Sequence, residues 1–416
     1  MPDAAAVRAA VASAHREEWA AVVAATVRVT RDLDLAEDCA QDAFAAAVQH
    51  WPREGVPHRP GAWLTTVARR RALDALRRGA VGARTLPLLA VEEKRAPDPA
   101  DVVAGGLDDD RLRLILTCCH PALDRSAQVA LTLRLVCGLS TAEVARAFLV
   151  QESAMAARLT RAKKKIAQAR IPFRAPAPEE LDERLDGALA VVHLVVTTGH
   201  TAFSGEALHR EDLLETGTRL ARLLHDLVPR DPRVSGLLAL VLLTDARRTA
   251  RLSPAGEAVL LAQQDRGRWD QGMIAEGAAL VERSLRAGIT RYGIQAAIAA
   301  THAAAPSWEE TDWPEILALY DELLARWPSP VVALNRAVAL SYRDGPAAGL
   351  AALEALRSDP IAEIYPYLAA AEADMLRRLG RRDEAAQACA SAIALTRNEV
   401  EKAQLQAQLR ELTGQG

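Results

Sequence analysis

The stretch from residue 126 to residue 170 constrains the fold more than any other, because its apolar, capping and glycine positions spell out successive helices. A first helix is predicted from Ser126 to Val136, and Gly138 suits its C-terminus. A second helix begins at Ser140, where Glu143 three residues later completes a capping box. These signals predict two short helices joined by a tight turn.

A third helix is predicted to begin near Ser153 and to carry the charge of this stretch. Its apolar residues recur at spacings of four, three and four and form one buried stripe: Met155, Leu159, Ala162 and Ile166. Between Ser153 and Arg170 there are six basic residues and no acidic one. A capped helix, a turn and a cationic helix predict a helix-turn-helix whose second helix enters the major groove of DNA. The alternative is an amphipathic helix with a solvated basic end. The capping box and the regular stripe favour DNA binding.

Length and composition predict a soluble, all-α, multidomain protein. A chain of 416 residues is expected to hold two or three domains. Half of its residues are hydrophobic, mostly Ala, Leu and Val, and only 4% are aromatic, which favours packed helices. No apolar run approaches the roughly 20 residues that span a bilayer, and no signal-peptide pattern is present. We therefore expect a cytoplasmic protein that makes no membrane contact. The five cysteines have no framework spacing and are expected to be reduced.

Charge is distributed unevenly along the chain. Residues 1–170 hold 25 Lys and Arg against 20 Asp and Glu, a net charge of +5. The remainder holds 26 against 34, a net charge of −8. This asymmetry predicts that only the first part of the chain meets nucleic acid.

The N-terminal region from about Ala4 to Val48 is predicted to form two helices with a break at residues 32–34. Asp34 is expected to cap the second helix, with Glu37 completing the box. Four apolar side chains of that helix are expected to face inward: Leu35, Cys39, Phe44 and Val48. Four polar side chains are expected to project as an acidic strip: Glu37, Asp38, Gln41 and Asp42. Taken alone, such a strip also fits an ordinary solvated face.

A loop from Trp51 to Pro60 precedes a second basic helix. The loop contains three prolines and a glycine. The helix that follows has an apolar stripe through Trp63 and Leu76, and its last three turns hold one acid and five arginines: Asp74, Arg69, Arg70, Arg71, Arg77 and Arg78. Residues 79–107 are rich in Pro, Gly and Ala, become acidic, and are predicted to be a linker. A further helix is expected from Asp108 to His120, before Pro121.

Two motifs in this order carry a resemblance to a known family. The pair AEDCAQDAF … PGAWLTTVARRRALDALRR and LSTAEVARAFLVQESAMAARLTRAKKKI resembles the sigma factors of the extracytoplasmic-function (ECF) type. The resemblance implies a region-two domain over residues 1–80, a flexible acidic linker over 81–107 and a region-four helix-turn-helix domain over 108–172. It also implies that the protein directs core RNA polymerase to promoter DNA and catalyses no reaction itself.

The resemblance also implies roles for individual residues. The residues expected to bind the clamp of core polymerase are Glu37, Asp38, Gln41, Asp42 and Phe44. The loop before the second basic helix would capture an unstacked base, and contacts to the opened downstream promoter element are expected from Trp63, Arg69, Arg70, Arg71, Asp74, Arg77 and Arg78. Contacts to the upstream element are expected from Gln151, Glu152, Ser153, Ala156, Ala157, Arg158, Thr160, Arg161, Lys163 and Lys164. The family often has Asn where Arg70 stands and Lys where Ala156 stands.

The second half, residues 173–416, is predicted to be a separate helical domain with an internal repeat. NRAVALSYRDGPAAGLAALEAL aligns loosely with AAEADMLRRLGRRDEAAQACASAIAL, and Gly345 and Gly380 lie 35 residues apart. This pattern resembles tetratricopeptide repeats, whose period is about 34 residues. It also resembles the ECF subgroup with a tetratricopeptide-like extension. That likeness implies a regulatory domain within the chain, which could bind a small regulatory protein.

Other clusters are interpreted as structural, and no cofactor or metal is expected. Cys118 and Cys119 lack the spacing of a zinc site and are interpreted as buried thiols. The remaining clusters are read as scattered histidines and as packing tryptophans: His193, His200 and His209, and Trp308, Trp313 and Trp327. Two alternatives remain open at this point. One is a free-standing helix-turn-helix regulator with a tetratricopeptide sensor, and the other is an enzyme that uses the histidines.

Overall fold

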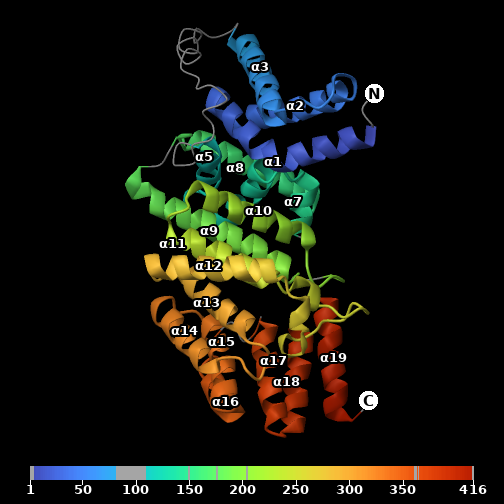
Figure 1. Cartoon of the computed structure of the whole chain (residues 1–416), viewed down its shortest axis with the longest axis vertical. Helices are drawn as coiled ribbons and strands as arrows, with labels where there is room; N and C mark the ends of the chain where they lie inside the picture. Colours follow the sequence, from blue (N-terminus) through green and yellow to red (C-terminus); the bar gives the residue numbers. More distant parts are fainter. Residues whose placement is uncertain are drawn as a thin grey trace. The chain divides into compact units, whose positions relative to one another are not determined.

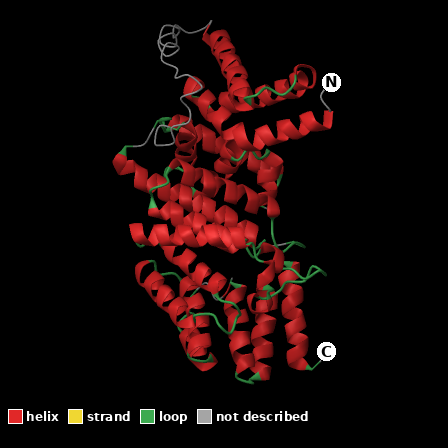
Figure 2. Cartoon of the chain, in the orientation of Figure 1, coloured by secondary structure: helices red, strands yellow, loops and turns green. Residues whose placement is uncertain are grey.

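The computed structural model describes residues 4–80, 109–148, 150–174, 177–202, 205–359, 363 and 365–414. The regular secondary structure of these residues is helical throughout and includes no strand (Figure 2). The all-α prediction is therefore confirmed. The chain divides into two compact units, residues 1–192 with 226–228, and residues 193–225 with 229–416. The predicted linker, residues 81–107, lies outside the described residues.

Three helices begin the first unit: α1 (Ala4–Thr30), α2 (Leu33–Glu54) and α3 (Pro60–Ala80). Each packs against the other two (Figure 1). The break between α1 and α2 falls where it is predicted, but the cap is Asp32 and not Asp34. The side chain of Asp32 accepts hydrogen bonds from the backbone N–H groups of Asp34 and Leu35, at 2.8 and 3.0 Å. Asp34 is left with an exposed carboxylate inside the first turn.

The predicted loop from Trp51 to Pro60 is shorter in the structure, because α2 continues to Glu54. Pro52 lies in the last turn and has no N–H, so the helix loses one backbone hydrogen bond near its end. Trp51 is fully buried, and its ring meets the edge of Trp63 at a centroid distance of 5.7 Å. Burial of this large side chain outweighs the local preference of proline for a helix end. Only residues 55–59 connect α2 to α3.

The helix-turn-helix follows the predicted pattern with one change. The helices are α5 (Asp110–Cys118), α6 (Arg125–Leu131), α7 (Thr141–Ala147) and α8 (Glu152–Gln168). The predicted first helix is split, because a π-helical turn, η3 (Thr132–Val136), follows α6. Gly138 ends this segment at a φ of 74°. The capping box of α7 is present, with Ser140 N–H donating to Glu143 Oε2 at 2.6 Å and Glu143 N–H donating to Ser140 Oγ at 3.2 Å.

The chain then continues through α9 (Pro178–His200) into the second unit, whose remaining α-helices have the following bounds: α10 (Glu211–Leu227), α11 (Pro232–Asp245), α12 (Gln271–Ala287), α13 (Arg291–Ala304), α14 (Trp313–Arg326), α15 (Pro330–Arg343), α16 (Pro346–Glu354), α17 (Pro366–Arg378), α18 (Arg382–Leu395) and α19 (Glu399–Thr413). From α11 onward every helix packs against the next one in sequence (Figure 1). Such nearest-neighbour packing is typical of helical repeat proteins.

The predicted internal repeat corresponds to two helix pairs. Gly345 lies between α15 and α16 at a φ of 95°, and Gly380 lies between α17 and α18 at a φ of 76°. Both glycines therefore occupy turns with a backbone conformation that other residues rarely adopt. Leu334, Leu353 and Met375, from α15, α16 and α17, share one hydrophobic core. Within the described residues, no helix is both long and apolar enough to cross a membrane.

Candidate nucleic-acid interface

The helix α8 presents most of its predicted DNA-reading residues to solvent. Its buried face is the predicted stripe of Met155, Leu159, Ala162 and Ile166. The opposite face is exposed at Gln151, Glu152, Ser153, Ala156, Ala157, Thr160, Arg161 and Lys164. Arg158 is half-buried, and its guanidinium lies 5.3 Å from the ring centroid of Phe148 in the turn. This cation–π contact fixes the turn against the start of α8.

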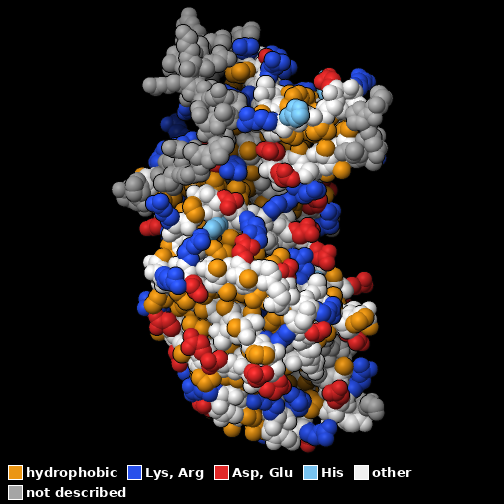
Figure 3. Space-filling view, viewed as in Figure 1, with side chains coloured by type: hydrophobic (Ala, Val, Ile, Leu, Met, Phe, Trp, Pro, Cys, Tyr) orange, Lys and Arg blue, Asp and Glu red, His pale blue; other side chains and the backbone are white. Residues whose placement is uncertain are grey.

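The helix α3 also carries an exposed basic face, as predicted. Basic side chains gather over α3 at the top of the view in Figure 3. The exposed members of the predicted set are Arg70, Arg71, Asp74, Arg77 and Arg78, whereas Trp63 and Arg69 are half-buried. Arg71 donates to the carboxylate of Asp42 at 2.8 Å, and Arg77 lies 3.7 Å from that of Asp74. Because these pairs are exposed, they cost little to exchange for phosphate contacts.

The acidic strip on α2 is only partly as predicted. Asp38, Gln41 and Asp42 are exposed. Partial burial raises the pKa of Asp38, and the neighbouring Glu37 raises it further. Glu37 itself does not project, because only 4% of its surface is exposed. Its assignment to an exposed strip is therefore wrong.

Two apolar side chains of α2, Phe44 and Val48, lie in opposite surroundings. Phe44 is buried, as its inward position predicts, and its ring lies 5.1 Å from that of His15 and 5.7 Å from that of Trp19. Phe44 therefore supports α2 from within and offers no exposed contact. Val48 was expected to face inward but is 55% exposed. Val48 lies on the solvent side of α2, whereas Ala47 and Trp51 continue its buried face.

Glu37 is buried because it is the centre of a charged cluster that joins α2 to the helix-turn-helix. Its carboxylate forms ion pairs with Arg134 in η3 and with Lys163 in α8, the second at 2.7 Å. The amide of Gln41 also donates to Glu37, at 3.0 Å. Lys163 makes a second ion pair with Asp34, again at 2.7 Å. We call these four charged residues, Asp34, Glu37, Arg134 and Lys163, the Glu37 cluster.

Lys163 therefore departs from its predicted place on the exposed face of α8. Only 11% of its side chain is exposed. Burial by itself would lower the pKa of Lys163, but the carboxylates of Glu37 and Asp34 outweigh this and raise the pKa. Its charge is thus fixed and already neutralised within the chain. The sequence contains one signal for the burial of Glu37. This residue lies four positions after Leu33 and three before Ala40, which places it on the apolar face of α2.

Further contacts between α1 and the helix-turn-helix surround the Glu37 cluster. The buried indole N–H of Trp19 donates to the backbone oxygen of Leu135 at 3.1 Å. Arg28 forms an ion pair with Asp110 at 3.3 Å. Gly138 faces the rings of His15 and Trp19 so closely that a Cβ atom there would lie 2.9 Å from the former. The helix α1 therefore packs directly against the helix-turn-helix, in addition to the ion pairs that join them.

The cysteines and histidines considered above lie in packed surroundings. Burial raises the pKa of Cys118 and raises that of Cys119 to about 11. Burial also lowers the pKa of His200 and lowers that of His193 to about 4. In the described part of the chain, no group of three or more His, Cys, Asp and Glu is arranged to hold a metal ion.

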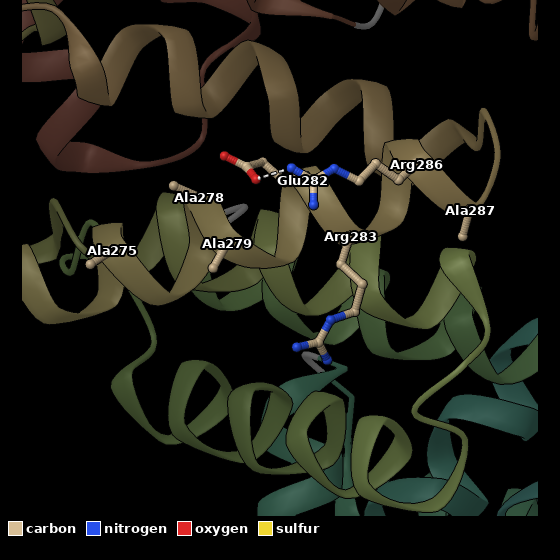
Figure 4. Close-up of a pocket in the computed structure, with 7 residues that line it drawn as sticks. All are labelled: Ala275, Ala278, Ala279, Glu282, Arg283, Arg286 and Ala287. Carbon is tan, nitrogen blue, oxygen red and sulfur yellow. Dashed lines mark hydrogen bonds and ion pairs between the residues drawn. The ribbon is translucent and has the colours of Figure 1, made fainter.

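The second unit contains an aromatic cluster and a shallow pocket. The rings of Trp308, Trp313 and Tyr342 contact one another, which confirms a packing role for these tryptophans. The pocket lies on a single face of α12, lined mostly by alanines (Figure 4). Its carboxylate, Glu282, is already paired with Arg286 at 2.9 Å. Its lining holds no nucleophilic side chain and no unpaired carboxylate.

Comparison with known proteins places the two helices with exposed basic faces, α3 and α8, in known families. Residues 17–81 match the family Sigma-70 region 2, and residues 113–166 match Sigma-70, region 4. Residues 184–285 match a family of unknown function (DUF6596). A protein of Rhizobium meliloti (strain 1021), described as uncharacterized, is 43% identical over 398 residues, which are 94% of this chain and 93% of that protein. No solved structure matches the chain. Regions 2 and 4 at this spacing recognise promoters and initiate transcription with core RNA polymerase. The chain therefore belongs to the ECF-like sigma factors that carry a C-terminal extension.

Proposed function

We propose that this sigma factor divides its work among three surfaces. The exposed acidic residues of α2 bind the clamp of core RNA polymerase, the arginines of α3 follow the opened strand of the downstream element, and α8 reads the upstream element. The observation that carries the proposal is the separation of faces on α8. One face is a buried apolar stripe, and the opposite face is polar, cationic and exposed.

On α8, position along the helix decides the kind of contact. Small and polar residues at its start, such as Ser153, Ala156 and Ala157, allow close approach to base edges in the major groove. Arg161 and Lys164, further along, are placed to neutralise phosphates. We expect the first group to contribute sequence preference and the second to contribute affinity that falls with salt.

On α3, the arginines suit a single strand better than a duplex groove. Arg70, Arg71, Arg77 and Arg78 are exposed along one helix, and cationic side chains in a row follow a phosphate backbone. Trp63 lies at the other end of α3, half-buried against Trp51, and offers part of its ring for stacking on a base. Stacking would offset the few kcal/mol needed to extrude that base.

We further propose that the C-terminal extension regulates the sigma factor by binding a small protein. Its helices stack by nearest-neighbour contacts, which in other repeat proteins produces an extended binding surface. Deletion of residues after 174 should change the level of transcription in cells without removing regions 2 and 4. Transcription that stays unchanged would contradict a regulatory role.

The polymerase contact is tested by charge reversal on α2. We expect Asp38→Lys to weaken binding of core polymerase about tenfold, or ~1.4 kcal/mol, because complementary charge is replaced by like charge. Glu54→Lys is the matched control, since Glu54 is an exposed acid near the end of the same helix and forms an ion pair with His50 in the same turn. Affinity would be measured by fluorescence anisotropy of the labelled sigma factor. Equal affinities for the two variants would contradict the proposed surface and favour a regulator that acts without polymerase.

A further inference from the structure

Three half-buried arginines of the second unit form no ion pair with any described carboxylate. Arg247 and Arg251 flank the short helix η4 (Arg248–Ala250), and Arg266 begins η6 (Arg266–Arg268). We call these three residues the Arg247 cluster, and we propose that the cluster binds a phosphate group, either free or as part of a small molecule. The proposal does not depend on the roles given to α2, α3 and α8. It gives the extension a small-molecule ligand in addition to any protein partner.

The three guanidinium groups lie close enough to repel one another. Burial lowers the pKa of Arg247 to about 10, and the charges of Arg251 and Arg266 contribute to the decrease. Burial also lowers the pKa of Arg251 to about 10, so both groups are still charged at neutral pH. Enclosed like charges are costly unless an anion compensates them. The neighbouring Arg248 avoids this cost, because it forms an ion pair with Asp245.

Arg251 and Arg266 have a structural role that Arg247 lacks. Each donates to backbone oxygens at the end of a helix, where the carbonyl groups carry partial negative charge. These oxygens lie at the ends of α9 and α13 and belong to His200, His302 and Ala305. In the described part of the chain, by contrast, the guanidinium of Arg247 has no hydrogen-bond partner, although part of its surface is accessible to solvent. The Nη2 atom of Arg266 is buried and likewise has no partner there. The cluster therefore has unused donors as well as surplus charge.

The unused donors and the surplus charge favour a phosphate group. A guanidinium presents a planar fork of N–H groups that matches the oxygens of a carboxylate or a phosphate. A tetrahedral phosphate has oxygens in several directions, so it can accept from arginines that approach from separate segments. Glu401 attracts Arg251, but its carboxylate accepts a hydrogen bond from the hydroxyl of Tyr367 at 2.8 Å. No described carboxylate acts on Arg247 itself.

The cluster lies where the first and last helices of the second unit meet. In Figure 1 the segment between α11 and α12, which carries the cluster, lies beside α19. Asn398, just before α19, donates to the backbone oxygens of Ala202 and Ala207 after α9, at 2.9 and 2.8 Å. Arg251 donates to Thr201 in the same loop, at 3.2 Å. A phosphate that neutralises the cluster would stabilise this junction, so the extension would respond to the concentration of a small anion.

Isothermal titration calorimetry of the full-length protein with inorganic phosphate, at constant ionic strength, tests the proposal. Arg247→Gln should weaken phosphate binding about tenfold or more, because it removes a charged donor. Arg283→Gln is the matched control, since it removes an exposed arginine from α12 in the same unit and should bind like the unmodified protein. Arg247→Lys keeps the charge but loses the fork, so its affinity should fall between the two. Equal affinities in Arg247→Gln and Arg283→Gln would overturn the proposal.

Two further ligands identify the chemistry of the site. Glycerol 3-phosphate should also bind, and binding tighter than that of inorganic phosphate would identify the ligand as a phosphorylated small molecule. Binding weaker than that of inorganic phosphate would identify free phosphate. Succinate carries two carboxylates and should bind more weakly than either. Tighter binding of succinate would overturn the assignment to phosphate.

Hydrogen exchange and thermal melting separate a ligand site from a structural role of Arg247. Phosphate should slow exchange in residues 246–270 and at the end of α13. Protection confined to α3 or α8 would overturn the proposal, because phosphate would then bind only the DNA-facing arginines. In phosphate-free buffer, Arg247→Gln should melt at the same temperature as the unmodified protein or higher, since it relieves charge repulsion. A lower melting temperature would show that Arg247 is stabilised within the chain, and would also overturn the proposal.

Discussion

Replacement of Gly138 by alanine should be unusually costly, because this glycine touches region 2 across the chain. Its φ of 74° is a conformation that costs a residue with a Cβ about 1 kcal/mol or more. The added Cβ would lie 2.9 Å from His15 Cε1 and 3.0 and 3.1 Å from two ring atoms of Trp19. The imidazole can move aside, but Trp19 is 2% exposed and its indole is held by Leu135. Such overpacking costs about 1–3 kcal/mol.

Gly380→Ala is the matched control for Gly138→Ala. Gly380 has a φ of 76°, but no atom lies within 4 Å of its added Cβ. We therefore expect Gly380→Ala to lower the local opening free energy by about 1 kcal/mol, from backbone strain alone. Gly138→Ala should lower it by about 2–4 kcal/mol, because overpacking adds to the strain. Hydrogen exchange with mass spectrometry would give the opening free energy of the segment around each glycine. Equal losses at the two positions would show that α1 and the helix-turn-helix are not packed in solution, and would refute the reasoning.

Three further predictions concern DNA, acid and thiol chemistry. Arg161→Ala should weaken binding to all promoter duplexes alike and reduce the slope of log affinity against log salt by about 1, as measured by anisotropy. Acid should destabilise the second unit, because burial lowers the pKa of His193 and His302 to about 4 while the unfolded value is 6.5. The contribution of these neutral histidines to the free energy of unfolding is complete above pH 6.5 and is lost as the pH falls toward 4. The loss should reach up to about 2 kcal/mol for each histidine between pH 7 and pH 5. Urea unfolding would measure it, and an unchanged free energy of unfolding would contradict the prediction. Iodoacetamide at pH 8 should label partly exposed Cys137 at least a hundredfold faster than buried Cys119, whose pKa of about 11 leaves about a thousandth as thiolate. Equal labelling by mass spectrometry would show that the region-four core is open.

The local features of the fold could be predicted from the sequence because their causes are local. The capping box at Ser140 and Glu143 and the four-residue stripe of α8 each depend on residues within one or two turns. The turns at Gly345 and Gly380 also follow from a local requirement, a left-handed backbone conformation. Helix ends also depend on tertiary contacts, as the extension of α2 past the buried Trp51 to Glu54 demonstrates.

The Glu37 cluster could not be predicted in the same way. Glu37 and Lys163 are 126 residues apart, and each has an ordinary local explanation, one as part of an acidic strip and the other as part of a basic face. Only their packing shows that the two faces meet. A charged residue on an apolar helix face was the available signal, and it indicates a buried partner elsewhere in the chain.

Transcription from a promoter template by core RNA polymerase with the purified protein tests the central claim most directly. The account predicts that the protein copurifies with core polymerase and that the pair produces run-off transcripts from specific start sites, which neither component produces alone. Failure of the purified protein to form this complex would contradict the account.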